Sequence, residues 1–104
     1  MLITSQDNFA DREITETLGL ARGNVVRARF FGRDILAGLR MIIGGEVIEY
    51  TKLLAEAREQ ALDRMLSNAE GMGADAVVTV RFSTSMVMQG AAEILVTATA
   101  VKLR

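Results

Sequence analysis

The feature that most constrains the fold is a long amphipathic stretch between residues 47 and 70. Apolar and charged side chains recur there at intervals of three or four residues, which is the period of an α-helix with one buried face. At 1.5 Å per residue this helix is roughly 36 Å long, which is long for so small a chain. The apolar stripe runs through Val47, Tyr50, Leu54, Ala57, Ala61, Met65 and Ala69, and Gly71 and Gly73 follow as natural left-handed C-cap positions.

The segments on either side of this helix alternate with the two-residue period of β-strands. Short strands are expected at 2–5 and at 75–82, the latter extending as far as Met88, and the last strand is expected at 94–103 after a turn at 89–91. Residues 14–21 and 25–31 also alternate, and the intervening Arg22-Gly23-Asn24 is a turn or bulge signal, so this region is either a hairpin or one long bent strand. Asp34 is placed to cap a short helix over 35–43. The chain is therefore predicted to be a single α+β domain over residues 1–104.

The strands near the C-terminus are apolar on both faces. In the last strand Ile94 and Val96 lie on one side, and Leu95 and Val101 lie on the other. Apolar residues on both sides of a strand indicate that both faces of its sheet are covered. One long helix shields only one face, so we expect a second subunit to cover the other.

Composition excludes several kinds of chemistry. The chain has no His, Cys, Trp or Pro. Disulfide frameworks, Cys/His zinc sites and Ser-His-Asp or Cys-His nucleophiles are therefore excluded, and any general base would be a carboxylate, Lys or Tyr. No cofactor site is evident. The N-terminus lacks the basic region of a signal peptide, and no stretch approaches the ~20 apolar residues of a membrane span, which predicts a cytoplasmic protein without a membrane partner.

Charge is distributed in alternating blocks although the net charge is only −1. Residues 22–40 carry five Arg against Asp34, and residues 41–75 carry seven acids against three cations. The arginines suit a phosphate or nucleic-acid patch, or else salt bridges to Glu56, Glu59 or Asp63 of a neighbouring copy. Because the overall charge is not basic and aromatics are few, we favour the salt bridges over nucleic acid.

Several motifs occur together in a fixed order. Ala37-Gly38-Leu39-Arg40 and Ile42-Ile43-Gly44-Gly45 precede the helix, and Gly73-Ala74-Asp75-Ala76-Val77-Val78 follows it. From about Thr4 to Val101 the chain resembles the YbjQ-like family of small bacterial and archaeal proteins, which is sometimes labelled as heavy-metal-binding. It departs from the usual pattern at Met41, where Asp is common, and at Thr79, where Gly is common.

This resemblance implies a dodecin-like subunit with a small antiparallel sheet packed against the long helix and a short one. It also implies a ring-shaped homo-oligomer, a homopentamer built partly by strand pairing between subunits. The family label implies a metal ion, but the absence of His and Cys argues against soft heavy metals.

The candidate ligand-binding residues gather mostly around the double glycine. Free backbone N–H groups at the start of a long helix suit an anion, although a tight corner between helices is the favoured explanation of the glycines. Glu46 and Glu49 share a helix face and suit a hard metal ion, and the favoured alternative is an ordinary solvated face. Asp75 is placed as a strand cap, and the Met86-x-Met88 pair is taken as packing. The full set is Arg40, Gly44, Gly45, Glu46, Glu49, Tyr50 and Asp75.

The first hypothesis for function is a non-enzymatic, oligomer-forming domain whose main partner is another copy of itself. The alternative is a protein that binds a metal ion or a small anion through the carboxylates near Gly44-Gly45. An enzyme acting across a subunit interface has the least support, because no catalytic constellation is evident.

Overall fold

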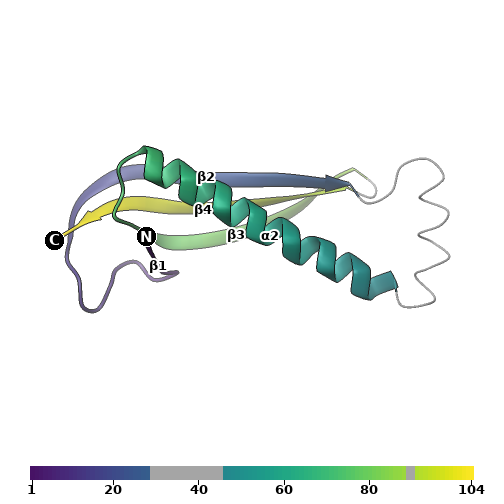
Figure 1. The fold of residues 1–104 in the computed structure, drawn as a ribbon, viewed down its shortest axis with the longest axis horizontal. Coiled ribbons are helices and arrows are strands. Elements are labelled where there is room, and N and C mark those ends of the chain that lie inside the picture. Colours follow the sequence, from purple (N-terminus) through teal and green to yellow (C-terminus); the bar gives the residue numbers. More distant parts are fainter. Residues whose placement is uncertain (29–45, 89–90) are drawn as a thin grey trace.

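A computed structural model describes residues 1–28, 46–88 and 91–104. Within these ranges the chain forms β1 (Leu2–Ile3), β2 (Ile14–Ala28), α2 (Glu46–Gly71), β3 (Ala76–Met88) and β4 (Ala91–Leu103), and Figure 1 shows α2 lying across the long strands. The α+β class is confirmed, and α2 matches its predicted range within one residue at each end. The predicted short helix over 35–43 and the turn residues Gln89 and Gly90 lie outside the described residues.

The described strands form one mixed sheet in the order β1-β3-β4-β2. β4 pairs antiparallel with both β2 and β3, but β1 pairs parallel with β3 through Leu2–Ala76 and Ile3–Val77. The expectation of a purely antiparallel sheet is therefore wrong at this edge. The chain can place β1 parallel to β3 because the whole of β2 and α2 lies between them in sequence, which is ample for a crossover.

Residues 14–28 form one continuous strand rather than a hairpin. Two irregularities in its pairing with β4 occur before Gly19, and the register is unbroken from Gly19 to Ala28. Gly23 is thus not in a turn. It lies under α2, where an added Cβ atom would be only 2.3 Å from the backbone nitrogen of Met65 and 2.4 Å from the carbonyl oxygen of Ala61. A glycine here lets the helix backbone approach the strand.

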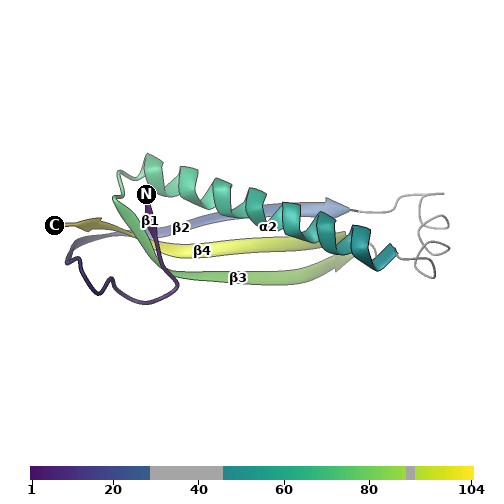
Figure 2. The ribbon, with the colours of Figure 1, turned by 60° about the horizontal axis from the view of Figure 1, so that its bottom comes forward.

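The core lies between α2 and the β2–β4 half of the sheet (Figure 2). The predicted stripe of α2 is confirmed from Ala57 onward, because Ala57, Ala61, Met65 and Ala69 are all fully buried. Small side chains at three of these four positions fit the close approach at Gly23. Beneath them lie Ala21 and Val25 of β2 together with Ile94, Val96, Ala98 and Ala100 of β4.

The end of α2 is fixed by Gly73, which has φ +83°. The Gly73 N–H donates to the Glu70 carbonyl oxygen at 3.0 Å, and the Ala74 N–H donates to the Ala69 carbonyl oxygen at 3.2 Å. These two bonds form a Schellman motif with Gly73 at the left-handed position. Of the two glycines predicted as caps, Gly73 takes this role and Gly71 is the last helical residue.

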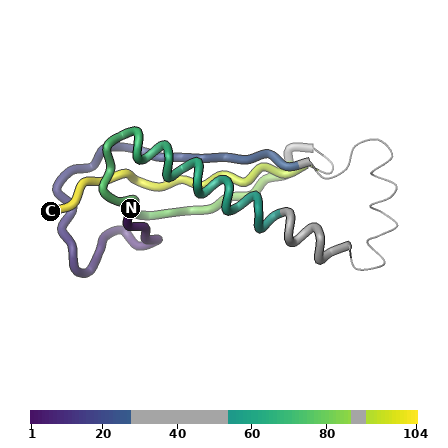
Figure 3. Tube along the Cα trace, viewed as in Figure 1, coloured from purple at the N-terminus to yellow at the C-terminus, as the bar shows by residue number. Residues whose placement is uncertain are grey.

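The face of the sheet opposite α2 carries a second, smaller apolar cluster. Ala76, Val78 and Val101 are buried there against Phe9, Ile14 and Leu103. Figure 3 shows the segment between β1 and β2 looping past the end of the sheet where β3 begins and β4 ends. The chain therefore covers part of this face with its own N-terminal segment, whereas the sequence pattern had suggested another subunit. No helix in the described part of the chain is long and apolar enough to cross a membrane.

Candidate functional site

The candidates near the double glycine are only partly within the described ranges. Arg40, Gly44 and Gly45 lie outside them, whereas Glu46 is the first residue of α2 and Glu49 and Tyr50 follow within four positions. Asp75 lies just beyond the other end of this helix. A helix of 26 residues is about 39 Å long, so Asp75 belongs to a different part of the molecule from Glu46.

Asp75 makes two hydrogen bonds that join β3 to β4. One oxygen of its carboxylate accepts the Leu103 N–H at 3.0 Å, and its own N–H donates to the Val101 carbonyl oxygen at 2.9 Å. The side chain is exposed, and the described groups around it do not form a ligand cluster. This geometry fits the strand-capping interpretation of Asp75.

Thr79 adopts a left-handed conformation, with φ +56°, which costs a non-glycine residue of order 1–3 kcal/mol. It stands where the YbjQ-like pattern commonly has glycine, and two bonds hold it in place. Its N–H donates to the Gln6 carbonyl oxygen at 2.8 Å, and its hydroxyl lies 3.0 Å from Oδ1 of Asp7. Thr79 thus ties the N-terminal segment to the point where the β3–β4 register shifts.

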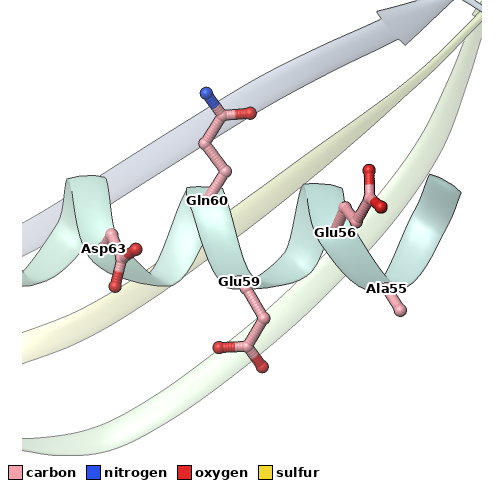
Figure 4. Close-up of a pocket in the computed structure, with 5 residues that line it drawn as sticks. All are labelled: Ala55, Glu56, Glu59, Gln60 and Asp63. Carbon is pink, nitrogen blue, oxygen red and sulfur yellow. The ribbon is translucent and has the colours of Figure 1, made fainter. Parts of the chain in front are cut away.

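The outer side of α2 is acidic. Ala55, Glu56, Glu59, Gln60 and Asp63 line a shallow hollow of about 450 Å³. Figure 4 shows their side chains pointing in different directions, with Gln60 reaching toward β2 and Glu59 extending to the opposite side of the helix. Among the described residues no three Asp or Glu side chains converge in a way that could hold a metal ion. We call Glu56, Glu59 and Asp63 the acidic ridge.

The outer edge of β2 is closed by side chains from α2. The Arg22 N–H donates to Oδ1 of Asn68 at 3.0 Å, and Nη1 of Arg64 donates to the Asn24 carbonyl oxygen at 2.7 Å. Further along, Nη2 of Arg27 donates to Oε1 of Gln60 at 2.6 Å. An exposed strand edge is a template for further pairing, and these bonds occupy it at Arg22 and Asn24.

A polar hollow of about 480 Å³ lies at this closed edge, lined by Arg22, Asn24, Asn68 and Leu95. Nδ2 of Asn24 donates to Oε2 of Glu93 at 3.1 Å, so this amide nitrogen already has a hydrogen-bond acceptor. Asn68 uses its carbonyl oxygen on the Arg22 N–H, so it presents its amide nitrogen as a donor beside the exposed Arg22 side chain. We call this feature the Arg22 hollow.

The outer edge of β3 is open over most of its length. Among the described residues, backbone bonds to the N-terminal segment reach only as far as Val80, whose N–H donates to the Thr4 carbonyl oxygen at 3.2 Å, and Nη1 of Arg81 donates to the Ser5 carbonyl oxygen at 3.1 Å. Beyond Val80, no described strand lies on this side of β3. Phe82 and Met86 pair with Val96 and Ala92, so they lie on the sheet face that carries α2, yet they are 51% and 76% exposed. α2 leaves them uncovered because it packs mainly on β2 and β4.

The sequence patterns did not separate these two edges. Alternation shows which side chains share a face, but it does not show where a diagonal helix stops covering that face. The Arg22 hollow depends on Asn68, which lies 46 residues away in the chain. The one available signal was the series of polar residues at four-residue spacing on α2, Gln60, Arg64 and Asn68, which all bond to β2.

Comparison with known proteins gives the same family over the whole chain. A family model described as "Putative heavy-metal-binding" (YbjQ) matches residues 1–104. The chain is 59% identical over 103 residues to a UPF0145 protein of Methanosarcina acetivorans, covering 99% of this chain and 97% of that protein. It is 54% identical to UPF0145 proteins of Photobacterium profundum and Archaeoglobus fulgidus, covering 99% and 100% of this chain and 100% and 96% of those proteins.

A solved structure shows the same fold at low sequence identity. It is the crystal structure of a protein of unknown function from Pediococcus pentosaceus, with a TM-score of 0.69 and 12% identity, covering 100% of this chain and 98% of that one. The family-model match over residues 1–104 and the relatives above 50% identity at full length show that the chain belongs to the YbjQ-like (UPF0145) family.

Proposed function

We propose that this protein is a non-enzymatic building block of a homo-oligomeric ring, and specifically of a homopentamer. The observation that carries the proposal is the pair Phe82 and Met86, two large apolar side chains left exposed beside the open edge of β3. An apolar side chain in water forgoes the roughly 25 cal/mol per Å² that burial supplies. A neighbouring copy that covers them recovers this free energy.

The open edge of β3 supports the same assembly. Backbone N–H and C=O groups of an edge strand alternate between facing the sheet and facing outward. The Val77 carbonyl oxygen and the Val80 N–H bond to Thr4 of the N-terminal segment. By the same alternation the backbone groups of Phe82, Thr84 and Met86 face outward. A strand from another copy can pair with these groups. Charged side chains usually protect an unpaired strand edge from pairing. The segment from Phe82 to Met86 carries none.

The non-enzymatic part of the proposal rests on the residue inventory. The chain has neither His nor Cys, which are the side chains that most often serve as base or nucleophile near neutral pH. The acids of the ridge are exposed, and Figure 4 shows them spread along the helix rather than gathered at one point.

The proposal predicts that Phe82→Ser combined with Met86→Ser dissociates the oligomer. Light scattering coupled to size exclusion should give about five times the 11.3 kDa chain mass for the unmodified protein, and a mass near one chain for the variant. The variant should keep its circular dichroism spectrum, because both side chains are exposed in the single chain. Leu20→Ser is the matched control, since Leu20 is 59% exposed on the opposite face.

Two outcomes would contradict the proposal. An unmodified protein that runs as a single chain would exclude the ring. If Leu20→Ser dissociated the oligomer equally, the contact could not be assigned to Phe82 and Met86.

A second function follows from the family description and the start of α2. Glu46 and Glu49 lie three positions apart at this helix end, and carboxylate oxygens suit a hard divalent ion such as Mg²⁺ better than a soft one. We propose a weak carboxylate site there, with Arg40, Gly44, Gly45 and Tyr50 as its neighbours in sequence. The same helix start is the place where a small anion would bind.

Isothermal titration with Mg²⁺, Zn²⁺, Ni²⁺ and Cu⁺ tests this second function. Saturable heat is expected with Mg²⁺, and the combined change Glu46→Gln and Glu49→Gln should abolish it. Glu70→Gln, near the far end of α2, is the matched control and should leave the heat unchanged. The absence of saturable heat with all four ions would exclude the site.

A further inference from the structure

The β2 side of the molecule is basic. Arg22, Arg27 and Arg64 lie along it, and the bonds of Arg27 and Arg64 described above go to a side-chain amide and a backbone carbonyl rather than to carboxylates. A hydrogen bond to a neutral acceptor orients a guanidinium without cancelling its charge. Within the described residues no ion pair within 4 Å involves any of the three. Arg22 and Arg64 are also exposed, so their positive charge faces solvent.

The acidic ridge carries the opposite charge on the same molecule. Glu56, Glu59 and Asp63 are spaced three and four residues apart and are all exposed. Like charges at these spacings repel each other across one helical turn and destabilise the helix. A cation from outside the helix relieves this repulsion. Among the described residues the only carboxylate–guanidinium pair within 4 Å is Glu13 with Arg104, at the far end of the sheet.

The Arg22 hollow is shaped and charged to receive a carboxylate. Its volume of about 480 Å³ is ample for a carboxylate-bearing side chain. The exposed guanidinium of Arg22 and the amide nitrogen of Asn68 supply donors, and planar guanidinium groups bind carboxylates through two parallel hydrogen bonds. Glu93 lies close by and keeps its negative charge, but its Oε2 accepts the Asn24 amide at 3.1 Å, which orients that carboxylate toward Asn24.

We propose that the Arg22 hollow of one copy receives the acidic ridge of another copy. The inference rests on the proposed homo-oligomer, and it names the surfaces that meet. The evidence for the occupant is charge complementarity, because a basic edge and an acidic ridge of equal formal charge occur on one chain. The two surfaces differ, so the contact is head-to-tail, and a head-to-tail contact that closes forms a ring. Complementary charges of this kind set register and partner choice.

Charge reversal with rescue tests the contact. Arg22→Glu alone, and Glu59→Lys with Asp63→Lys alone, should each weaken assembly by about tenfold or more, measured as the concentration at which the oligomer dissociates in light scattering. The chain that carries all three changes should assemble at nearly the concentration of the unmodified protein, because both surfaces are reversed together. Glu70→Lys, an exposed acid on α2 outside the ridge, is the matched control and should not weaken assembly.

The outcomes separate this inference from the proposed function. An unmodified protein that is a single chain would overturn both. An unmodified oligomer that survives Arg22→Glu, or a triple variant that is not rescued, would overturn the contact between hollow and ridge while the oligomer itself stands. Circular dichroism of each variant should show that the fold is retained, since all three side chains are exposed.

Raising NaCl from 0.05 to 0.5 M is expected to weaken assembly of the unmodified protein and of the triple variant alike, because the Debye length falls from more than about 10 Å to well below it.

Discussion

Replacing Gly23 with alanine is expected to prevent α2 from packing on β2 and to remove about 4 kcal/mol or more of folding free energy. The new Cβ atom would lie 2.3 Å from the nitrogen of Met65, 2.4 Å from the carbonyl oxygen of Ala61 and 2.8 Å from the carbonyl carbon of Arg64. All three are backbone atoms of a helix, so no side chain can move aside. A domain with a total stability of ~5–15 kcal/mol would be largely unfolded or rearranged by such a change.

Urea unfolding followed by circular dichroism measures this effect. Gly71→Ala is the matched control, because a Cβ atom at Gly71 would meet nothing within 4 Å and the residue is helical. There alanine should stabilise the protein by up to about 1 kcal/mol. A Gly23→Ala protein with unchanged stability would mean that α2 does not lie this close to β2.

Replacing Met65 with alanine is expected to cost about 2–5 kcal/mol. Met65 is fully buried and is the largest of the fully buried side chains. Its truncation leaves a cavity between α2 and the sheet, and the neighbouring Ala61 and Ala69 are too short to fill it. The same urea titration measures the loss.

Leu62→Ala is the control for this change, since Leu62 lies on the same helix and is only half-buried. It should cost clearly less than Met65→Ala. Equal losses at the two positions would contradict the depth at which Met65 is placed in the core.

The helical part of the fold was predictable from sequence because it depends on local periodicity. The range of α2 and its buried stripe follow from the three- and four-residue spacing of apolar side chains. Strands β3 and β4 were also predicted, although β4 begins three residues earlier than expected, at Ala91. Ala91 and Ala92 are small side chains that follow a turn signal and carry little β preference of their own.

The errors arise where a residue's role depends on distant parts of the chain. Gly23 has the local character of a turn residue, but its actual role is set by the backbone of α2 some 40 residues further along. The parallel pairing of β1 depends likewise on where β3 lies. Phe9 helps to cover the cluster that contains Val101, and no pattern within the last strand indicates that the far N-terminal segment contributes this cover.

The candidate site was predictable only in part. Asp75 was expected to cap a strand, and its bond to the Leu103 N–H fits that expectation. Residue spacing also showed that the acidic positions on α2 share its outer side. The Arg22 hollow was not foreseen, because it combines residues from two strands and a helix. Thr79 was noted as a departure from the family pattern, and its positive φ is a conformation that glycine adopts without strain.

One edge of the sheet is bonded to side chains and the other is largely open, and this difference has a consequence for aggregation. Uncontrolled stacking of β-sheets requires that each added molecule present a new edge to the next. In the part of the chain that the structure describes, Asn68 and Arg64 occupy the backbone groups of β2 at Arg22 and Asn24, whereas β3 has no neighbouring strand beyond Val80. In the proposed ring the open β3 edge of each copy is covered by the next copy, so closure of the ring leaves no open edge for further growth. A small chain that is half apolar can in this way expose an edge for assembly without becoming a seed for fibres.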